Sequence, residues 1–190
     1  MPDAPDTPGD AGTAAPDDST RPYLVVIGAP GAGKTRIGKK VAKMLRVPFV
    51  DTDRRIVMRH GPIAQIFSGR GEDHFRRIER VEVAKALTER AVVSLGGGAV
   101  LDPATQADLA DKRVALMTVS AEAVAMRLGQ SRPLLQRGGV AAWEGLVAAR
   151  RDIYERLASR SWDTSTRPID TIAREIADWV TADCAKETAP

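Results

Sequence analysis

Residues 28–35 read GAPGAGKT, and this stretch determines how the rest of the chain is interpreted. It fits the pattern G-x-x-x-x-G-K-[ST], which follows a strand and opens a helix in proteins that bind nucleoside triphosphates. The context agrees, because an apolar run at 23–27 precedes the stretch and apolar residues at helical spacing follow within 34–45. A glycine-rich turn with a chance Lys-Thr pair is the alternative, but it would not need both flanking elements.

The phosphate loop predicts a nucleotide site with defined roles for its residues. Its glycines let backbone N–H groups point at phosphate oxygens, and the following helix adds its positive N-terminal end. Lys34 is placed to neutralise the β- and γ-phosphates, and Thr35 offers a hydroxyl to Mg²⁺. We therefore expect ATP and Mg²⁺ as cofactors, although the motif does not identify the phosphate acceptor. The expected nucleotide-binding residues here are Gly31, Ala32, Gly33, Lys34, Thr35 and Arg36.

Outward from this loop, strand and helix signals alternate along the chain. Alternation of this kind predicts an α/β fold in which a parallel sheet is covered by helices on both faces. Ligands of such folds bind at the carboxyl ends of the strands, where the loops after residues 27, 50 and 95 would lie. Strands are expected at 23–27, 48–50, 91–95, 113–119 and 161–163. Helices are expected at 34–45, within 54–90 with breaks near 61–62 and 69–71, after an N-cap at Asp102 with Pro103 at the first helical position, from Ser120 to about Leu128, and at 141–158 and 168–182.

Two carboxylates follow the second expected strand, at Asp51 and Asp53. At a strand end they can diverge toward two ligands. Asp51 is suited to hold Mg²⁺ through water, and Asp53 to accept a proton or hydrogen bond from a substrate hydroxyl. The alternative for Asp53 is a helix N-cap, a position that favours aspartate on stability grounds alone.

Several arginines and a glycine triplet complete the candidate residues. Arg76 and Arg150 lie on expected helices, where each is either half of a surface ion pair or a bidentate partner of a substrate carboxylate. Arg132 lies in the Gly- and Arg-rich stretch 129–139, which is either a solvated loop or a lid over the triphosphate. The triplet at 96–98 follows a strand and would let a ligand touch backbone directly.

Composition limits the remaining possibilities. The 190 residues are 43% hydrophobic and 28% charged, which is typical of one globular domain. A single cysteine, Cys184, excludes an internal disulfide, and the most economical hypothesis is an inert residue in the last helix. His60 and His74 have no partners at the spacing of zinc ligands. Buried or partly exposed packing is expected of Phe67, Phe75, Trp143 and Trp162.

The charge distribution indicates the kind of partner. The formal net charge is +3, while residues 1–20 contain five aspartates and no base, so the remainder is more basic than the whole. Without a Lys/Arg-rich run, we expect small anions as ligands and no nucleic acid. No apolar run reaches the roughly 20 residues of a membrane span, and we expect neither a membrane segment nor a signal peptide. Residues 1–20 are interpreted as a disordered acidic tail and 21–190 as a single domain.

Taken together, the ordered motifs resemble the shikimate kinase family, within the nucleoside-monophosphate-kinase-like group of P-loop kinases. The resemblance runs from about residue 23 to the last helix. Each motif alone has low specificity, whereas the ordered set is highly specific. The matching stretches are GAPGAGKT at 28–35, DTD at 51–53, GEDHFRRIE at 71–79, SLGGGAV at 94–100, RPLL at 132–135 and AARRDIYE at 148–155.

The resemblance implies a three-layer fold with a five-stranded parallel sheet, a substrate-binding region at about 54–90 and a lid at about 129–139. It implies ATP-dependent phosphorylation of the 3-hydroxyl of shikimate by a cytoplasmic monomer. Asp53 would position the hydroxyl, Arg76 and Arg150 would hold the carboxylate, and Arg132 would be the lid arginine over ATP. Thr35 and Asp51 would belong to the Mg²⁺ shell, and Arg167 would lie beside adenine. The substrate ring would be lined by Gly96, Gly97 and Gly98.

Two positions depart from the family pattern, and three other functions stay open. Pro62 replaces a small hydroxyl residue and Val57 replaces an acid, which affects the shape expected for the acceptor pocket. The alternatives are another hydroxy-acid kinase such as a gluconate kinase, a nucleoside monophosphate kinase, and a catalytically silent nucleotide-binding regulator. The carboxylate-directed arginines argue against a monophosphate acceptor. A silent regulator would be expected to lack at least one of Lys34, Asp51, Asp53 and Arg132, all of which are present.

Overall fold

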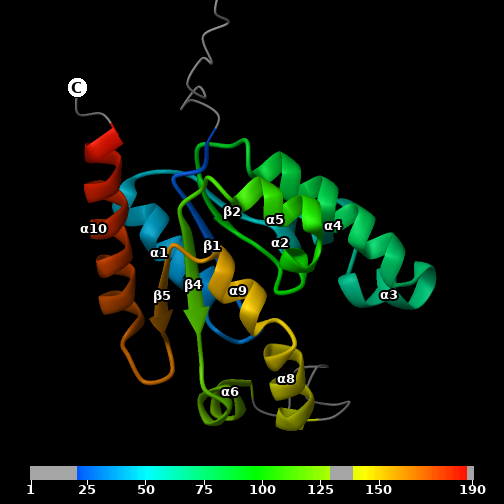
Figure 1. Cartoon of the computed structure of the whole chain (residues 1–190). Coiled ribbons are helices and arrows are strands. Elements are labelled where there is room, and N and C mark those ends of the chain that lie inside the picture. The colour runs from blue at the N-terminus through cyan, green and yellow to red at the C-terminus, as the bar shows by residue number, and fades with distance from the viewer. Residues whose placement is uncertain (1–20, 129–138, 188–190) are drawn as a thin grey trace, which may run out of the picture.

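A five-stranded parallel sheet forms the centre of the molecule (Figure 1). The computed structural model describes residues 21–128 and 139–187, so the expected tail and all but the last residue of the expected lid lie outside the described residues. The strand order β2-β3-β1-β4-β5, with every pair parallel, confirms the predicted sheet. The strands are β1 (Leu24–Gly28), β2 (Phe49–Asp51), β3 (Val92–Ser94), β4 (Val114–Thr118) and β5 (Arg160–Asp163).

Helices cover both faces of this sheet, as the alternation predicts. One face is packed by α1 and α10 and the other by α4, α5 and α9, each through a buried aliphatic cluster (Figure 1). No helix in the described ranges is long and apolar enough to cross a membrane. The helices are α1 (Lys34–Leu45), α2 (Thr52–His60), α3 (Ile63–Arg70), α4 (Glu72–Ala86), α5 (Pro103–Leu109), α6 (Ala121–Leu128), α8 (Gly139–Ala148), α9 (Arg151–Leu157) and α10 (Ile169–Glu187).

The register of the strands brings the informative loops to one edge. Val26 of β1 and Asp51 of β2 both pair with Ser94 of β3, and Gly28 pairs with Met117 of β4. Because parallel strands end on the same side, the phosphate loop, the aspartate pair and the glycine triplet all begin at this carboxyl edge.

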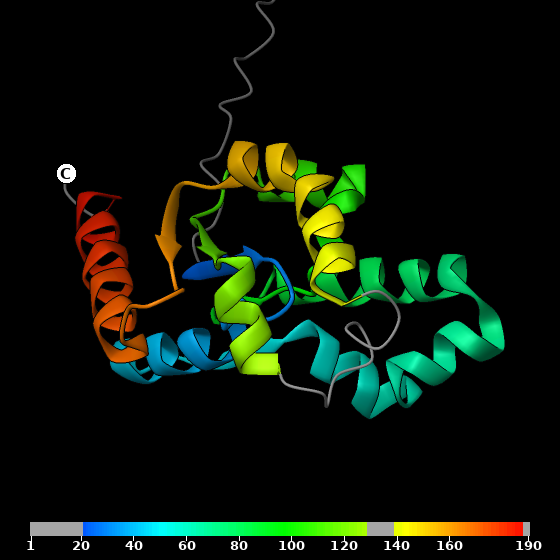
Figure 2. The same cartoon turned by 90° about the horizontal axis from the view of Figure 1, so that it is seen from below.

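Helices α2, α3 and α4, which we call the acceptor region after the role expected for residues 54–90, extend to one side of the sheet (Figure 2). The predicted breaks are confirmed, since Gly61 and Gly71 end α2 and α3 with φ of 86° and 79°, in the region that favours glycine. Phe67 and Phe75 stack with ring centroids 4.7 Å apart and close a small apolar core between the three helices.

The helix expected at 141–158 is instead two helices, which corrects the prediction. The chain bends at Ala149 and Arg150, and Arg150 is the N-cap of α9 with φ of −114°. Apolar periodicity runs through both helices and does not reveal the bend. The bend directs α9 onto the sheet, where Tyr154 is 3% exposed and joins the aliphatic cluster under α4 and α5.

Candidate functional site

The phosphate loop connects β1 to α1 in a conformation that requires glycine. Gly28, Gly31 and Gly33 have φ of 137°, 87° and 82°, and a Cβ at Gly28 would meet the backbone of Met117. The Lys34 ammonium donates to the carbonyls of Gly28 at 2.8 Å and Ala29 at 3.0 Å, so it lies across the loop. This arrangement of amides, helix N-terminus and ammonium fits a triphosphate.

Trp143 of α8 supports the same loop. Its indole Nε1 donates to the carbonyl of Pro30 at 2.8 Å, and its ring packs with Ala29 and Val124 in a small buried cluster. The expectation of packing is confirmed for this tryptophan. The hydrogen bond adds a function that no sequence signal indicated, because it joins residues far apart in the chain.

Thr35 and Asp51 meet at the mouth of the phosphate loop. The Thr35 hydroxyl donates to Asp51 Oδ2 at 2.7 Å, while Asp51 Oδ1 accepts from the Arg54 amide at 3.1 Å. Asp51, not Asp53, is therefore the N-cap of α2, and the alternative that Asp53 caps this helix is wrong.

The donor set of this pair fits Mg²⁺. A hydroxyl and a carboxylate are oxygen ligands of the kind that Mg²⁺ binds, and they lie in contact where a triphosphate would enter. Within the described residues, no cluster of three or more Asp, Glu, His or Cys side chains is suited to a metal ion. The fit is therefore to a cation that takes its remaining ligands from phosphates and water.

Asp53 lies in the first turn of α2, between the phosphate loop and the acceptor region. Burial raises the pKa of its carboxyl, the nearby Lys34 ammonium lowers it, Asp51 raises it and Arg76 lowers it. A desolvated carboxylate close to two cations is suited to accept a proton from a bound hydroxyl.

The glycine triplet runs between the phosphate loop and the side chains of Asp53, Arg76 and Glu79. A Cβ at Gly96 would overlap Asp53 Oδ1 and lie 2.8 Å from Glu79 Oε1, and one at Gly98 would lie 2.8 Å from Arg76 Nη2. A Cβ at Gly97 would lie 3.1 Å from Pro30 Cδ. Only glycine lets these side chains and the loop approach one another so closely.

Arg76 is held by two carboxylates on its own helix, α4. Its Nη1 lies 2.5 Å from Glu79 Oε2, and its Nη2 lies 3.0 Å from Glu72 Oε1. Glu79 is only 4% exposed, and burial raises the pKa of its carboxyl while the Arg76 guanidinium lowers it. This arrangement is not the surface ion pair that the sequence allowed, because Glu79 lies inside the site and fixes the guanidinium.

Arg150 and Tyr154 approach the triplet from α9 and share one acceptor. The carbonyl of Gly97 accepts from Arg150 Nη1 at 3.1 Å and from the Tyr154 hydroxyl at 2.6 Å. Burial raises the pKa of the Tyr154 hydroxyl, partly opposed by Arg150, so the phenol stays protonated and able to donate. The bend before α9 thus brings Arg150 beside Gly97.

The other predicted residues lie at the edge of the site or beyond the described ranges. Arg36 is exposed on α1, and Arg167 pairs with Glu175 of α10. Ala32 is fully buried within the phosphate loop. Arg132 lies outside the described residues, so its role stays a prediction.

The two positions that depart from the family pattern do not interrupt the contacts around the glycine triplet. Val57 is 42% exposed on α2, and Pro62 lies at the N-cap of α3 with φ of −57°. Neither is among the side chains against which the triplet packs.

Sequence reasoning missed Thr52 and the buried role of Glu79, and it gave Tyr154 no role of its own. The Thr52 hydroxyl accepts from the Gly96 amide at 3.2 Å and donates to the Ser94 carbonyl at 3.3 Å, which anchors the triplet to α2. Thr52 stands inside the DTD stretch and Tyr154 four residues after Arg150. Their position within quoted motifs is the signal that could have identified them.

Comparisons with known proteins identify the family that the motifs resemble. A family model described as shikimate kinase matches residues 30–181. The chain is 42% identical to a shikimate kinase from Thermobifida fusca, covering 84% of this chain and 95% of that protein. It is 44% identical to one from Mycobacterium avium, covering 82% and 91%.

Solved structures with a similar fold include a shikimate kinase and a gluconokinase. A shikimate kinase from Acinetobacter baumannii in complex with shikimate superposes with a TM-score of 0.80 at 27% identity, covering 87% of this chain and 96% of that one. A gluconokinase from Sinorhizobium meliloti 1021 reaches a TM-score of 0.57 at 16% identity, over 87% and 97%, a likeness of fold alone.

Proposed function

The chain belongs to the shikimate kinase family, and we propose that it transfers the γ-phosphoryl group of ATP to the 3-hydroxyl of shikimate. The observation that best supports this activity is the environment of Asp53. Asp53 packs against Gly96 of the triplet, and Lys34 of the phosphate loop and Arg76 of the acceptor region are both close enough to lower the pKa of its carboxyl. A donor site and an acceptor site therefore meet at one carboxylate, as direct transfer requires.

On the donor side, the amides of Gly31, Ala32 and Gly33 and the ammonium of Lys34 bind the phosphates. Thr35 and Asp51 would hold Mg²⁺, which when bound neutralises charge on the β- and γ-phosphate oxygens. Arg36 and Arg167 contribute at the nucleotide's edge. Arg132 is proposed to stabilise charge in the transition state from the lid.

On the acceptor side, Arg76 and Arg150 hold the carboxylate, and the triplet at 96–98 lines the ring. Asp53 orients the 3-hydroxyl and accepts its proton as the hydroxyl oxygen bonds to the γ-phosphorus. The bond from the γ-phosphorus to the β–γ bridging oxygen breaks at the same centre, and ADP leaves. Charge neutralisation and alignment supply most of the catalysis in reactions of this kind.

Formation of ADP, measured by a coupled assay, tests this function. Shikimate as acceptor is expected to give turnover well above the rate without acceptor, while gluconate, AMP and CMP give none above that background. Hydrolysis of ATP that is independent of acceptor would contradict the proposed function, and nucleotide binding without turnover would favour a silent regulator.

The proposal extends to a monomer that works in the cytoplasm, where ATP is supplied. Both the monomer and its place in the cytoplasm are what the family resemblance implies. Light scattering at the enzyme concentration of the assay tests this, and activity found only in a dimer would contradict it.

Replacing Arg76 or Arg150 by alanine is expected to raise the Kd for shikimate about 10- to 100-fold, because each variant loses a hydrogen bond to the charged carboxylate. The Kd for ATP should change little, because among the described residues the hydrogen bonds and ion pairs of the two side chains go to Glu72, Glu79 and Gly97 and not to the phosphate loop. Calorimetric titration of shikimate and of ATP measures the two Kd values separately. The matched controls are the exposed neighbours Arg77→Ala and Arg151→Ala. Equal weakening of both ligands in the Arg76 and Arg150 variants would contradict the assignment.

The hydroxyl of Tyr154 offers a smaller test of the same site. Tyr154→Phe keeps the ring in the core and removes the donor to the Gly97 carbonyl. The free energy of unfolding should fall by about 1 kcal/mol, a typical net hydrogen bond. The KM for shikimate should rise a few-fold, since Arg150 shares that carbonyl, while the KM for ATP stays constant. An unchanged KM for shikimate would limit Tyr154 to a structural role.

A further inference from the structure

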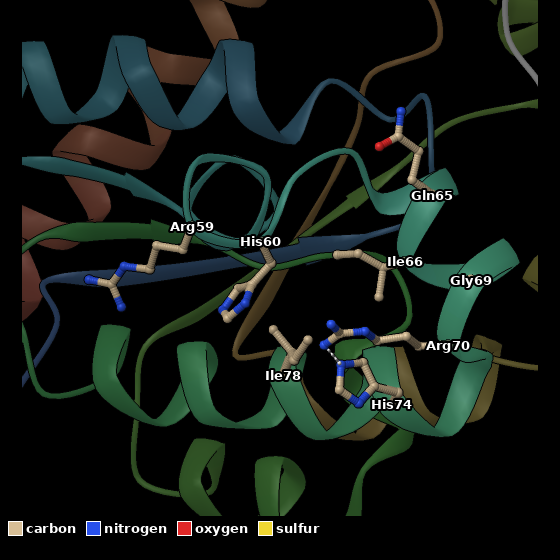
Figure 3. Close-up of a pocket in the computed structure, with 8 residues that line it drawn as sticks. All are labelled: Arg59, His60, Gln65, Ile66, Gly69, Arg70, His74 and Ile78. Carbon is tan, nitrogen blue, oxygen red and sulfur yellow. Dashed lines mark hydrogen bonds between the residues drawn. The ribbon is translucent and has the colours of Figure 1, made fainter.

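A cavity lies among α2, α3 and α4 (Figure 3). His74 and Ile78 line it from α4, and Arg76 is two residues from each, which places it on the opposite face of that helix. The cavity measures about 460 Å³. That volume falls within the range of roughly 300–1,000 Å³ that is typical of small-molecule sites.

The ionisable groups that line this cavity are all basic. Arg59, His60, Arg70 and His74 line it, and no carboxylate does. Arg59 is compensated, because its Nη1 lies 2.6 Å from the buried Glu82. Arg70 is not, because within the described ranges no carboxylate lies at ion-pair distance from it, and the hydrogen bond that it makes is to His74 Nε2 at 3.3 Å.

The hydrogen bond between Arg70 and His74 determines which groups can bind a ligand. The guanidinium is always a donor, so His74 Nε2 accepts and its Nδ1 has the proton. The remaining donors of Arg70 and the ring N–H groups of the histidines are available to one carboxylate. In Figure 3 the ring of His60 points toward Ile78.

We propose that this cavity binds a small organic monocarboxylate with a compact apolar body. Arg70 pairs with the carboxylate, and His60 and His74 add ring N–H donors. Ile66 and Ile78 contact the apolar body. One uncompensated guanidinium matches a single negative charge, and the two isoleucines favour an organic acid over inorganic phosphate.

This site is separate from the acceptor site. None of the residues that line it is Asp53, Arg76 or Arg150, nor belongs to the glycine triplet. A ligand can therefore occupy it while the acceptor site is filled, and binding here does not depend on which acid is phosphorylated.

The chain contains two histidines, and both line this cavity, so their imidazole NMR signals report on it directly. The probe is benzoate, titrated at constant pH into the full chain saturated with shikimate, and the neutral control is benzyl alcohol. Benzoate is expected to shift both imidazole signals saturably, and benzyl alcohol to shift neither at the same concentrations. Unshifted signals with benzoate would overturn the proposal.

Two variants test the role of Arg70. Arg70→Gln should raise the Kd for benzoate about 10-fold or more, the loss of a charge-assisted hydrogen bond. Arg77→Gln removes the same charge from an exposed position on α4 and should leave the Kd unchanged. Equal Kd values in the wild type and Arg70→Gln, or tighter binding of inorganic phosphate than of benzoate, would overturn the proposal.

Discussion

Asparagine in place of Asp53 is expected to lower kcat by at least about 10²-fold, since a positioned general base contributes ~10²–10⁴-fold. The amide has nearly the same shape as the carboxylate but cannot accept the hydroxyl proton. The Kd for ATP should remain within a few-fold of wild type, because the Lys34 ammonium and the loop backbone are unchanged. Single-turnover phosphoryl transfer and calorimetric titration of ATP measure the two quantities.

The same substitution should not destabilise the fold. Burial raises the pKa of Asp53 in the folded chain. A carboxyl whose pKa is higher in the folded than in the unfolded chain binds its proton more tightly when folded. The free energy of unfolding therefore falls as the pH rises from the unfolded-state pKa to the folded-state pKa. Asp53→Asn removes this loss of stability. At a pH above the folded-state pKa of Asp53, the Tm of the variant should therefore equal or exceed that of the wild type. Lost activity with retained or increased stability is typical of a residue selected for chemistry.

Asp73→Asn is the matched control for Asp53, because it removes an exposed carboxylate from the first turn of α4. Its kcat should stay near that of wild type. A wild-type kcat in Asp53→Asn would contradict a role in proton transfer. A fall in both Tm and ATP affinity would instead indicate that Asp53 acts through the structure of α2.

Most of the fold was predictable because its signals are local. Apolar runs that end in glycine or aspartate located the strands, and Gly61 and Gly71 marked the helix breaks through backbone conformations that glycine favours. The bend at Arg150 was not predictable. Helical periodicity continues across it, and contacts between α9 and the sheet determine it.

The site was only partly predictable for a related reason. Residues that act through their own backbone or charge, such as the phosphate-loop glycines, can be recognised from spacing. Residues that act through burial cannot, because a glutamate on a polar helix gives no sign that it is enclosed. Glu79 becomes part of the site only when the triplet packs across α4, and Asp51 replaces Asp53 as the cap only when α2 begins one residue after β2.

Removing the ammonium of Lys34 is the second large effect that we expect. Lys34→Ala should lower kcat/KM by at least about 10²-fold, the scale that follows loss of one positioned charge stabiliser. In the structure the ammonium bonds to the Gly28 and Ala29 carbonyls, from which it can turn to the β- and γ-phosphates. Stopped-flow measurement of transfer with shikimate gives the rate.

The Lys34 variant also has a pH signature that a structural defect would not produce. The Lys34 charge lowers the pKa of Asp53, so its removal should raise that pKa further. The acid limb of the residual kcat/KM profile should then shift to higher pH. Lys43→Ala, at the exposed end of the same helix, is the control and should show neither the loss nor the shift. A Lys34→Ala enzyme with wild-type kcat/KM would exclude Lys34 from the transfer step. A lowered kcat/KM with an unchanged acid limb would show that the Lys34 charge does not affect the pKa of Asp53. That result would contradict the electrostatic link between the phosphate loop and Asp53, which supports direct transfer.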